Sequence, residues 1–156
     1  MTNQYLAPAA VALDTGPLGL ATRKRGQSAE ADALQDWLDE LDEFGIPVYV
    51  PEIVDYELRR ELLRADKTTS IRRLDALNTR AVYLPLNTTA IQLAARLWSE
   101  ARRAGQTTAG SQRLDGDVIL AAQVQTLGVT GIVVATSNVA HLGRFVAAED
   151  WHNIAP

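Results

Sequence analysis

The sequence predicts an α/β domain in which helices cover both faces of a parallel sheet. Short apolar runs alternate with longer segments of helical periodicity along the chain. Within each run successive residues are apolar, which is typical of strands buried on both faces. Because the chain has 156 residues, a single domain spanning 1–156 is the expected organisation.

The first half of the chain is expected to hold two strands, each followed by a helix. Residues 9–13 form the first apolar run, which ends at the turn sequence 14–17. Ser28 can cap a helix that ends before the second strand, 46–50. Pro51 fits the first turn of the next helix, because its missing N–H has no partner there anyway.

The second half continues the same alternation. Its expected strands are 81–84, 132–135 and a fifth at Phe145–Val146. Thr88 can cap the helix after the third strand, and the polar residues 106–116 are predicted to be a loop. Asp117 is expected to open the helix that leads to the fourth strand.

The composition excludes several classes of protein. The chain has no cysteine and two histidines, so a disulfide framework, a thiolate nucleophile and a three-histidine zinc site are excluded. No apolar run approaches the length of about 18 residues that a membrane helix needs, and the first residues lack the basic start of a secretory signal. A cytoplasmic location is therefore expected.

Charge is distributed unevenly along the chain, although the net charge is only -4. Residues 30–57 are acidic and contain no basic residue, whereas residues 59–113 are predominantly basic. Another basic cluster lies at Arg23–Arg25. This pattern allows a basic face that binds nucleic acid, and it also fits ordinary solvated helix faces.

Three acids are expected to meet at the edge of the sheet where strands lead into helices. Asp14 follows the first strand, Glu57 lies about two turns into the helix after the second, and Asp117 begins the helix before the fourth. Each alone could be a turn residue, an exposed helix acid or a helix-end acid. Together they would repel one another unless a cation neutralised them, and Mg²⁺ and Mn²⁺ prefer such oxygen ligands.

These segments resemble the motifs of the PIN-domain ribonucleases, and among them the VapC toxins of toxin–antitoxin pairs. The similar segments are Leu13–Leu18, Tyr56–Leu58, Asp117–Ala122 and Thr136–Asn138. The resemblance implies a three-layer α/β/α sandwich with a central parallel sheet of four to five strands. It also implies hydrolysis of RNA that depends on Mg²⁺ or Mn²⁺.

The resemblance further implies which residues form the site. Asp14, Glu57 and Asp117 match the acidic triad of the family and would bind the metal, and Asp115 would be a fourth catalytic acid. Asn138 stands where many members carry Asp or Asn, and its neutral side chain would weaken metal binding. A PIN-like module that binds RNA or protein without cleaving is therefore the alternative.

The other implied contacts involve water, RNA and protein partners. Thr15, Thr136 and Asn138 would orient a ligand or a water. The residues expected to contact RNA phosphates are Arg59, Arg60 and Arg113, and the cluster Arg23–Arg25 is the alternative. The resemblance also implies a homodimer and a cognate antitoxin, with apolar side chains such as those of Trp37 and Leu62 at the contacts.

Overall fold

Five parallel strands form the centre of the protein. The computed structural model describes residues 5–105 and 111–156, apart from the side chains of residues 5, 6 and 111–113. The strands are β2 (Ala10–Leu13), β3 (Val48–Pro51), β4 (Val82–Leu84), β5 (Ile132–Ala135) and β6 (Ala148–Glu149). They pair in the order β4-β3-β2-β5-β6, and every pair is parallel, as the apolar runs predict.

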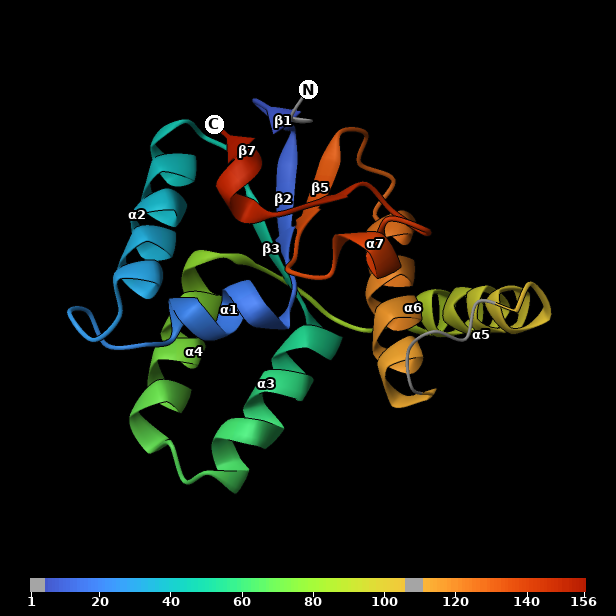
Figure 1. Ribbon diagram of the computed structural model, residues 1–156, viewed down its shortest axis with the longest axis horizontal. Helices are drawn as coiled ribbons and strands as arrows, with labels where there is room; N and C mark the ends of the chain where they lie inside the picture. Colours follow the sequence, from blue (N-terminus) through green and yellow to red (C-terminus); the bar gives the residue numbers. More distant parts are fainter. Residues whose placement is uncertain (1–4, 106–110) are drawn as a thin grey trace.

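Helices enclose this sheet and complete an α/β/α sandwich (Figure 1). On one side lie α1 (Thr15–Ala21), α2 (Ala29–Glu43) and α4 (Thr68–Arg80), and on the other lie α5 (Thr88–Arg103), α6 (Ser111–Thr126) and α7 (Val139–Leu142). The remaining helix, α3 (Glu52–Arg64), lies below the carboxyl edge of the sheet in Figure 1. In the part of the chain that the structure describes, no helix combines the length and apolarity needed to cross a membrane.

The direction of the crossovers changes at β2. The chain steps from β2 to β3 and β4 on one side, and then returns to place β5 on the other side of β2. In open α/β sheets, the crevice at such a reversal is where ligands bind. The carboxyl ends of β2 and β5 are therefore the expected place for a site.

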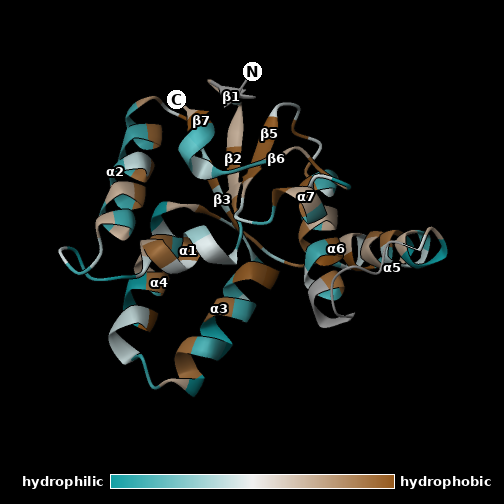
Figure 2. Ribbon diagram, in the orientation of Figure 1, coloured by the Kyte–Doolittle hydropathy of each residue, from teal (hydrophilic) through white to brown (hydrophobic). Residues whose placement is uncertain are grey.

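The core is built around β2 and β5, whose residues are all buried. Figure 2 shows these strands as apolar, whereas α2 and α3 alternate between apolar and polar faces. Leucines of the first two helices, Leu18, Leu34 and Leu41, are fully buried against the sheet. A separate apolar cluster joins α5 to α6, where small side chains such as Ala94 and Ala122 permit close packing.

A second, two-stranded sheet brings the two ends of the described chain together. In it β1 (Tyr5–Leu6) pairs in parallel with β7 (Ile154–Ala155), after the 3₁₀ turn Trp151–Asn153. Trp37 of α2 packs against Trp151, and its indole N–H donates to the carbonyl oxygen of Ile154 at 2.8 Å. Trp37 is therefore a buried side chain that anchors this end, and the expectation that it contacts a partner is wrong.

Residues 14–17 begin a helix, and the expectation of a turn there is wrong. The side chain of Asp14 accepts a hydrogen bond from the N–H of Thr15 at 2.8 Å and caps α1. Pro17 lies in the first turn of α1, where proline is tolerated because N–H groups have no partner within the helix. Because this segment is short and contains glycine and proline, its sequence shows no helical periodicity.

Three other boundaries differ from expectation. Ser28 caps α2 as predicted, but the cap of α5 is Asn87, whose side chain accepts from the N–H of Ala90 at 2.8 Å. Helix α6 begins at Ser111, so residues 111–116 are helical and not a loop, and Asp117 lies in the second turn of the helix. The rest of the predicted loop, residues 106–110, lies outside the described residues. The last strand of the main sheet is β6 and not Phe145–Val146, which form part of a turn.

Candidate active site

A pocket of about 400 Å³ lies at the carboxyl edge of the sheet, beside the ends of β2 and β5. Its lining residues are Asp14, Thr15, Gly16, Glu57, Asp117, Ser137 and Asn138. They come from the β2–α1 junction, from α3, from α6 and from the segment after β5. The pocket therefore occupies the reversal of strand order and is lined mainly by oxygen-bearing side chains.

Asp14 is held in place by the pairing of its strand. Leu13 of β2 pairs with Ala135 of β5, so Asp14 and Thr136 leave the sheet side by side. One carboxylate oxygen of Asp14 caps α1, and the other accepts a hydrogen bond from the hydroxyl of Thr136 at 2.8 Å. Because each carboxylate oxygen has two lone pairs, both remain able to accept a further ligand.

Thr136 links this carboxylate to the next segment. It is fully buried, and its hydroxyl oxygen accepts a hydrogen bond from the N–H of Asn138 at 2.8 Å while donating to Asp14. This chain of two hydrogen bonds fixes the start of the segment that carries Ser137 and Asn138 into the pocket.

Glu57 and Asp117 reach the pocket from two neighbouring helices. Asp117 is only 8% exposed, and the residue before it, Gly116, faces Glu57 directly. A Cβ atom on Gly116 would lie 2.9 Å from one carboxylate oxygen of Glu57 and 3.0 Å from the other. Glycine at this position therefore allows the carboxylate of Glu57 to lie against the backbone of α6.

The pKa of Glu57 is raised above its ordinary value of 4.5. The larger cause is burial, and the second is the negative charge of Asp14. The guanidinium of Arg60, which also lies over the ring of Tyr56 at 5.2 Å, acts in the opposite direction. Glu57 and Asp14 thus repel each other across the pocket when both are ionised.

The donor groups of the pocket fit a hard divalent cation. They are carboxylate, hydroxyl and amide oxygens, which Mg²⁺ and Mn²⁺ prefer, and a cation would relieve the repulsion that Glu57 experiences. Over residues 5–105 and 111–156, no three Asp, Glu or His side chains are close enough to hold one ion together. Mg²⁺ usually takes one or two carboxylates and keeps several waters, so a pair of these acids could hold it.

No protein-family model matches the sequence, and no curated protein is significantly similar to it. Solved structures do share its architecture. A chain of VapBC2 from Rickettsia felis, solved bound to a DNA fragment from its promoter, is 18% identical with a TM-score of 0.68, and the match covers 91% of this chain and 98% of that one. The protein has a VapC-like PIN fold.

Two further structures agree with this fold. DNA-bound VapBC from Salmonella typhimurium is 21% identical with a TM-score of 0.60, covering 91% of this chain and 98% of that chain. VapBC-1 from nontypeable Haemophilus influenzae is 16% identical with a TM-score of 0.62, and the match covers 92% of this chain and 98% of that chain. At such identities the likeness establishes the fold, so function has to be inferred from the residues of the pocket.

Asp115 does not join the other acids of the pocket, contrary to expectation. It is exposed and lines a different, apolar pocket of about 280 Å³ with Ile91 and Trp98 of α5. Residues two positions apart on a helix point in different directions. Asp117 therefore faces the acidic pocket, and Asp115 faces away from it.

Arg59 is also placed differently from its predicted role at RNA phosphates. Its guanidinium donates to both carboxylate oxygens of the buried Asp55, at 2.9 and 3.0 Å, and to Asp75 of α4 at 2.7 Å. These hydrogen bonds raise the pKa of Arg59 well above its usual range. Arg59 thus joins α3 to α4. Arg60 is exposed on α3, and the side chain of Arg113 lies outside the described residues.

Three residues of the site were not predicted from the sequence. Gly16 and Ser137 line the pocket, and Gly116 permits the approach of α6 to Glu57. The position of Gly116 between two aspartates was the available signal, but it indicated a loop as readily as a helix contact.

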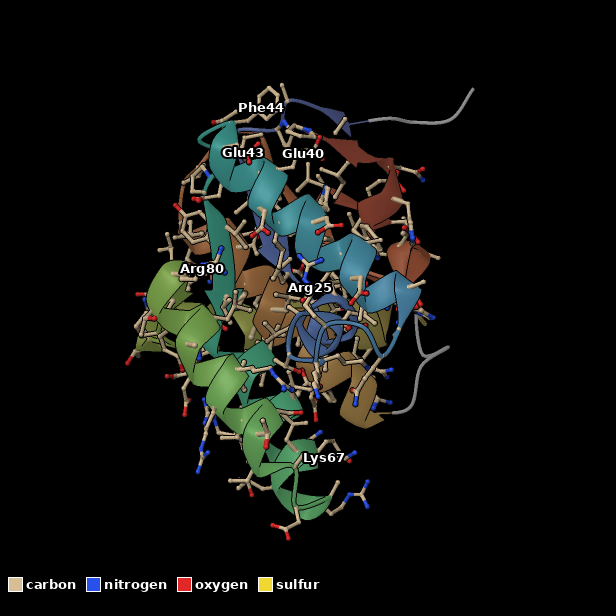
Figure 3. The ribbon with its side chains drawn as sticks, turned by 90° about the vertical axis from the view of Figure 1, so that its left-hand side faces the viewer. Arg25, Glu40, Glu43, Phe44, Lys67 and Arg80 are labelled. Atoms are coloured by element: carbon tan, nitrogen blue, oxygen red, sulfur yellow. The ribbon has the colours of Figure 1, made fainter. Side chains whose placement is uncertain are left out.

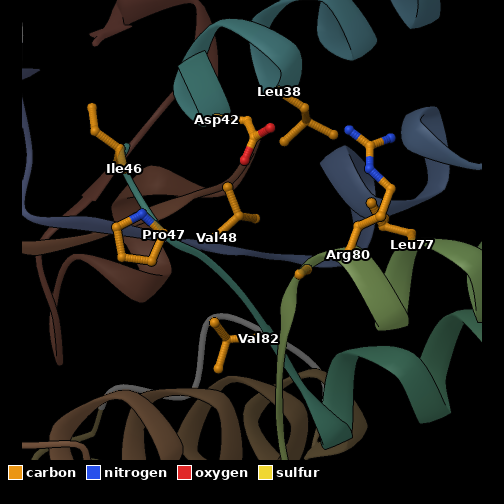
Figure 4. Close-up of a pocket in the computed structure, with 9 residues that line it drawn as sticks. Leu38, Asp42, Ile46, Pro47, Val48, Leu77, Arg80 and Val82 are labelled. Carbon is orange, nitrogen blue, oxygen red and sulfur yellow. The ribbon is translucent and has the colours of Figure 1, made fainter. Parts of the chain in front are cut away.

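A second pocket, of about 240 Å³, lies at the opposite edge of the sheet (Figure 4). Pro47, Val48 and Val82 at the starts of β3 and β4 line it, together with Leu38 of α2 and Leu77 of α4. It is mainly apolar, and it lies at the amino ends of the strands, away from the edge where ligands bind in such sheets. The acidic pocket is therefore the better candidate for chemistry.

Proposed function

We propose that the protein is an endoribonuclease that hydrolyses RNA phosphodiester bonds at the acidic pocket with Mg²⁺ or Mn²⁺. The observation that carries the proposal is the convergence of Asp14, Glu57 and Asp117 at the reversal of strand order in a PIN fold. Carboxylates that repel one another in a pocket favour a bound cation, and RNA hydrolysis is a reaction that such a cation assists.

Each side chain has a role in this proposal. The metal would activate a water as nucleophile and stabilise negative charge on the phosphoryl oxygens. Asp14 and Asp117 would hold it, with Glu57 completing the ligand set through a bound water. The hydroxyl of Thr136 keeps the carboxylate of Asp14 oriented, and the side chains of Thr15 and Asn138 would orient water or substrate.

The raised pKa of Glu57 suits a further role. A carboxylate with a raised pKa is a better proton acceptor near neutral pH than an ordinary one. When ionised, Glu57 could therefore take the proton from the attacking water, or hold that water by a hydrogen bond.

We also propose that the protein is the toxin of a toxin–antitoxin pair, with a cognate antitoxin as partner. The support is the shared fold with three structures of VapBC. A homodimer and a cytoplasmic location belong to the same proposal.

The direct test is cleavage of an end-labelled single-stranded RNA by the purified protein. We expect endonucleolytic products with Mg²⁺ or Mn²⁺ and none with EDTA. Asp14→Asn, purified in the same way, controls for contaminating nuclease and should lose the activity by orders of magnitude, because Asp14 is a proposed metal ligand. Equal cleavage by wild type and Asp14→Asn would overturn the proposal.

The neutral side chain of Asn138 favours one alternative, a PIN-like module that binds RNA or protein without cleaving it. Such a module would bind the same labelled RNA but produce no metal-dependent fragments. The cleavage assay therefore separates the two functions.

A further inference from the structure

A basic groove adjoins the acidic pocket. It has a volume of about 510 Å³ and shares Thr15 and Gly16 with the pocket. Its walls come from α1, the segment after α1, α3 and the beginning of α4. Four basic residues line it, Arg23, Lys24, Lys67 and Arg73, and no acidic residue does.

Within the described part of the chain, the four groove bases differ from two arginines on the same side of the protein in their lack of ion pairs with carboxylates. Arg25 and Arg80 form ion pairs with acids of α2, at 2.7 and 3.2 Å, and lie close to α2 in Figure 3. Among the residues that the structure describes, no ion pair joins a groove base to a carboxylate. Arg73 instead donates to the carbonyl oxygen of Thr22 at 3.3 Å, which fixes its position, and Lys67 projects from the turn before α4.

Four positive charges lining one concave surface attract a polyanion. Their potential is focused by the walls of the groove, although the protein as a whole has a net charge of -4. The acidic pocket repels phosphates, so affinity for RNA has to come from neighbouring surfaces. The groove is also lined by the apolar side chains of Leu20, Leu58 and Leu62, which suit the sugars and bases of an unpaired strand.

We propose that the basic groove binds the backbone phosphates of single-stranded RNA on one side of the scissile bond. The proposal rests on the ribonuclease function above and assigns the binding to these four bases in place of Arg59. An acidic polypeptide is the competing occupant. RNA is favoured because the groove leads past Thr15 and Gly16 directly into the acidic pocket, where an acidic peptide would meet like charge.

The test is the affinity of a short fluorescein-labelled RNA, measured by fluorescence anisotropy in EDTA over a series of salt concentrations. The double variant Lys24→Ala with Lys67→Ala should bind about tenfold more weakly at physiological salt, and the slope of log affinity against log salt should fall by about 1.4, because each lost phosphate contact contributes about 0.7. Lys24→Arg with Lys67→Arg should restore both values. All three proteins are expected to fold, because both lysines are exposed.

The matched control is Arg25→Ala with Arg72→Ala. It removes the same charge from two exposed positions that do not line the groove but follow or precede a groove residue, Arg25 after Lys24 and Arg72 before Arg73. We expect the control to lower RNA affinity by no more than about twofold. Equal losses of RNA affinity in the two double alanine variants, or no loss of affinity in either, would overturn the proposal.

Two further outcomes are distinguishable. If the lysine variant binds RNA normally but loses affinity for labelled poly-glutamate, the occupant is an acidic polypeptide and the proposal is wrong. Because the measurement uses EDTA, it does not depend on catalysis. Groove-dependent RNA binding by a protein that never cleaves RNA would therefore support the groove while refuting the ribonuclease function.

Discussion

Glu57 connects stability to the proposed chemistry. Its carboxylate lies against the backbone of Gly116 in α6, and burial and the charge of Asp14 both raise its pKa. An acid whose pKa is higher in the folded state than in the unfolded state binds protons more tightly when folded. Its contribution to stability is therefore greatest at low pH and decreases as the pH rises through the folded-state pKa.

We expect Glu57→Gln to be more stable than wild type at neutral pH in metal-free buffer. Glutamine keeps the size of the side chain and removes the charge that is costly in the pocket. Below the ordinary pKa of 4.5 the advantage should disappear, because wild-type Glu57 is then protonated in both states. Urea denaturation at both pH values measures the difference, and a less stable variant at neutral pH would show that the charge of Glu57 is not costly.

Gly116→Ala should separate activity from stability. Alanine favours a helix by about 1 kcal/mol relative to glycine, but its Cβ would displace the carboxylate of Glu57. Because that carboxylate is the end of a flexible side chain, we expect an unfolding free energy equal to or slightly above that of wild type, with reduced RNA cleavage. If the loss acts through Glu57, adding Gly116→Ala to Glu57→Gln should lower cleavage no further.

Helix α6 is the element that brings the acids together, and Gln123 holds it in place. This side chain is 1% exposed, accepts a hydrogen bond from the N–H of Ile53 at 3.2 Å and donates to the carbonyl oxygen of Leu84 at 2.8 Å. It thereby joins α6 to the start of α3 and to the end of β4. Glu57 and Asp117, which both line the acidic pocket, lie on the two helices that it connects.

Gln123→Leu should destabilise the protein by about 2 kcal/mol, because it leaves partly buried backbone groups of Ile53 and Leu84 without their side-chain partner. Gln125→Leu is the control on the same helix. Gln125 is exposed and makes one hydrogen bond, to the carbonyl oxygen of Phe145 at 2.9 Å, so its replacement should cost less than about 1 kcal/mol. Similar unfolding free energies for the two variants would contradict the anchoring role of Gln123.

At the scale of the whole molecule, topology places the site. The parallel strands and the reversal at β2 bring Asp14, Glu57 and Asp117 from distant parts of the sequence to one edge of the sheet. The order of apolar strands and acids was sufficient to predict this convergence, since right-handed crossovers leave few alternatives. The apolar runs likewise predicted four strands of the main sheet.

What the sequence did not predict depends on contacts between distant segments. Helix α1 is too short and too rich in glycine to show periodicity, and it is defined by the Asp14 cap and by packing. The first turn of α6 is polar, and Asp115 could be placed correctly only once residues 111–116 were seen to be helical. The interactions of Arg59 and Gln123 involve partners on other elements, which spacing along one helix cannot reveal.

The most direct test of the acidic site compares Asp117→Asn with Asp115→Asn. The two variants remove one negative charge from positions two residues apart on α6, but only Asp117 lines the acidic pocket. With Mg²⁺ or Mn²⁺, RNA cleavage by Asp117→Asn should fall by orders of magnitude while its melting temperature holds or rises, and Asp115→Asn should cleave like wild type. Undiminished metal-dependent cleavage by Asp117→Asn would contradict the assignment of this pocket as the active site.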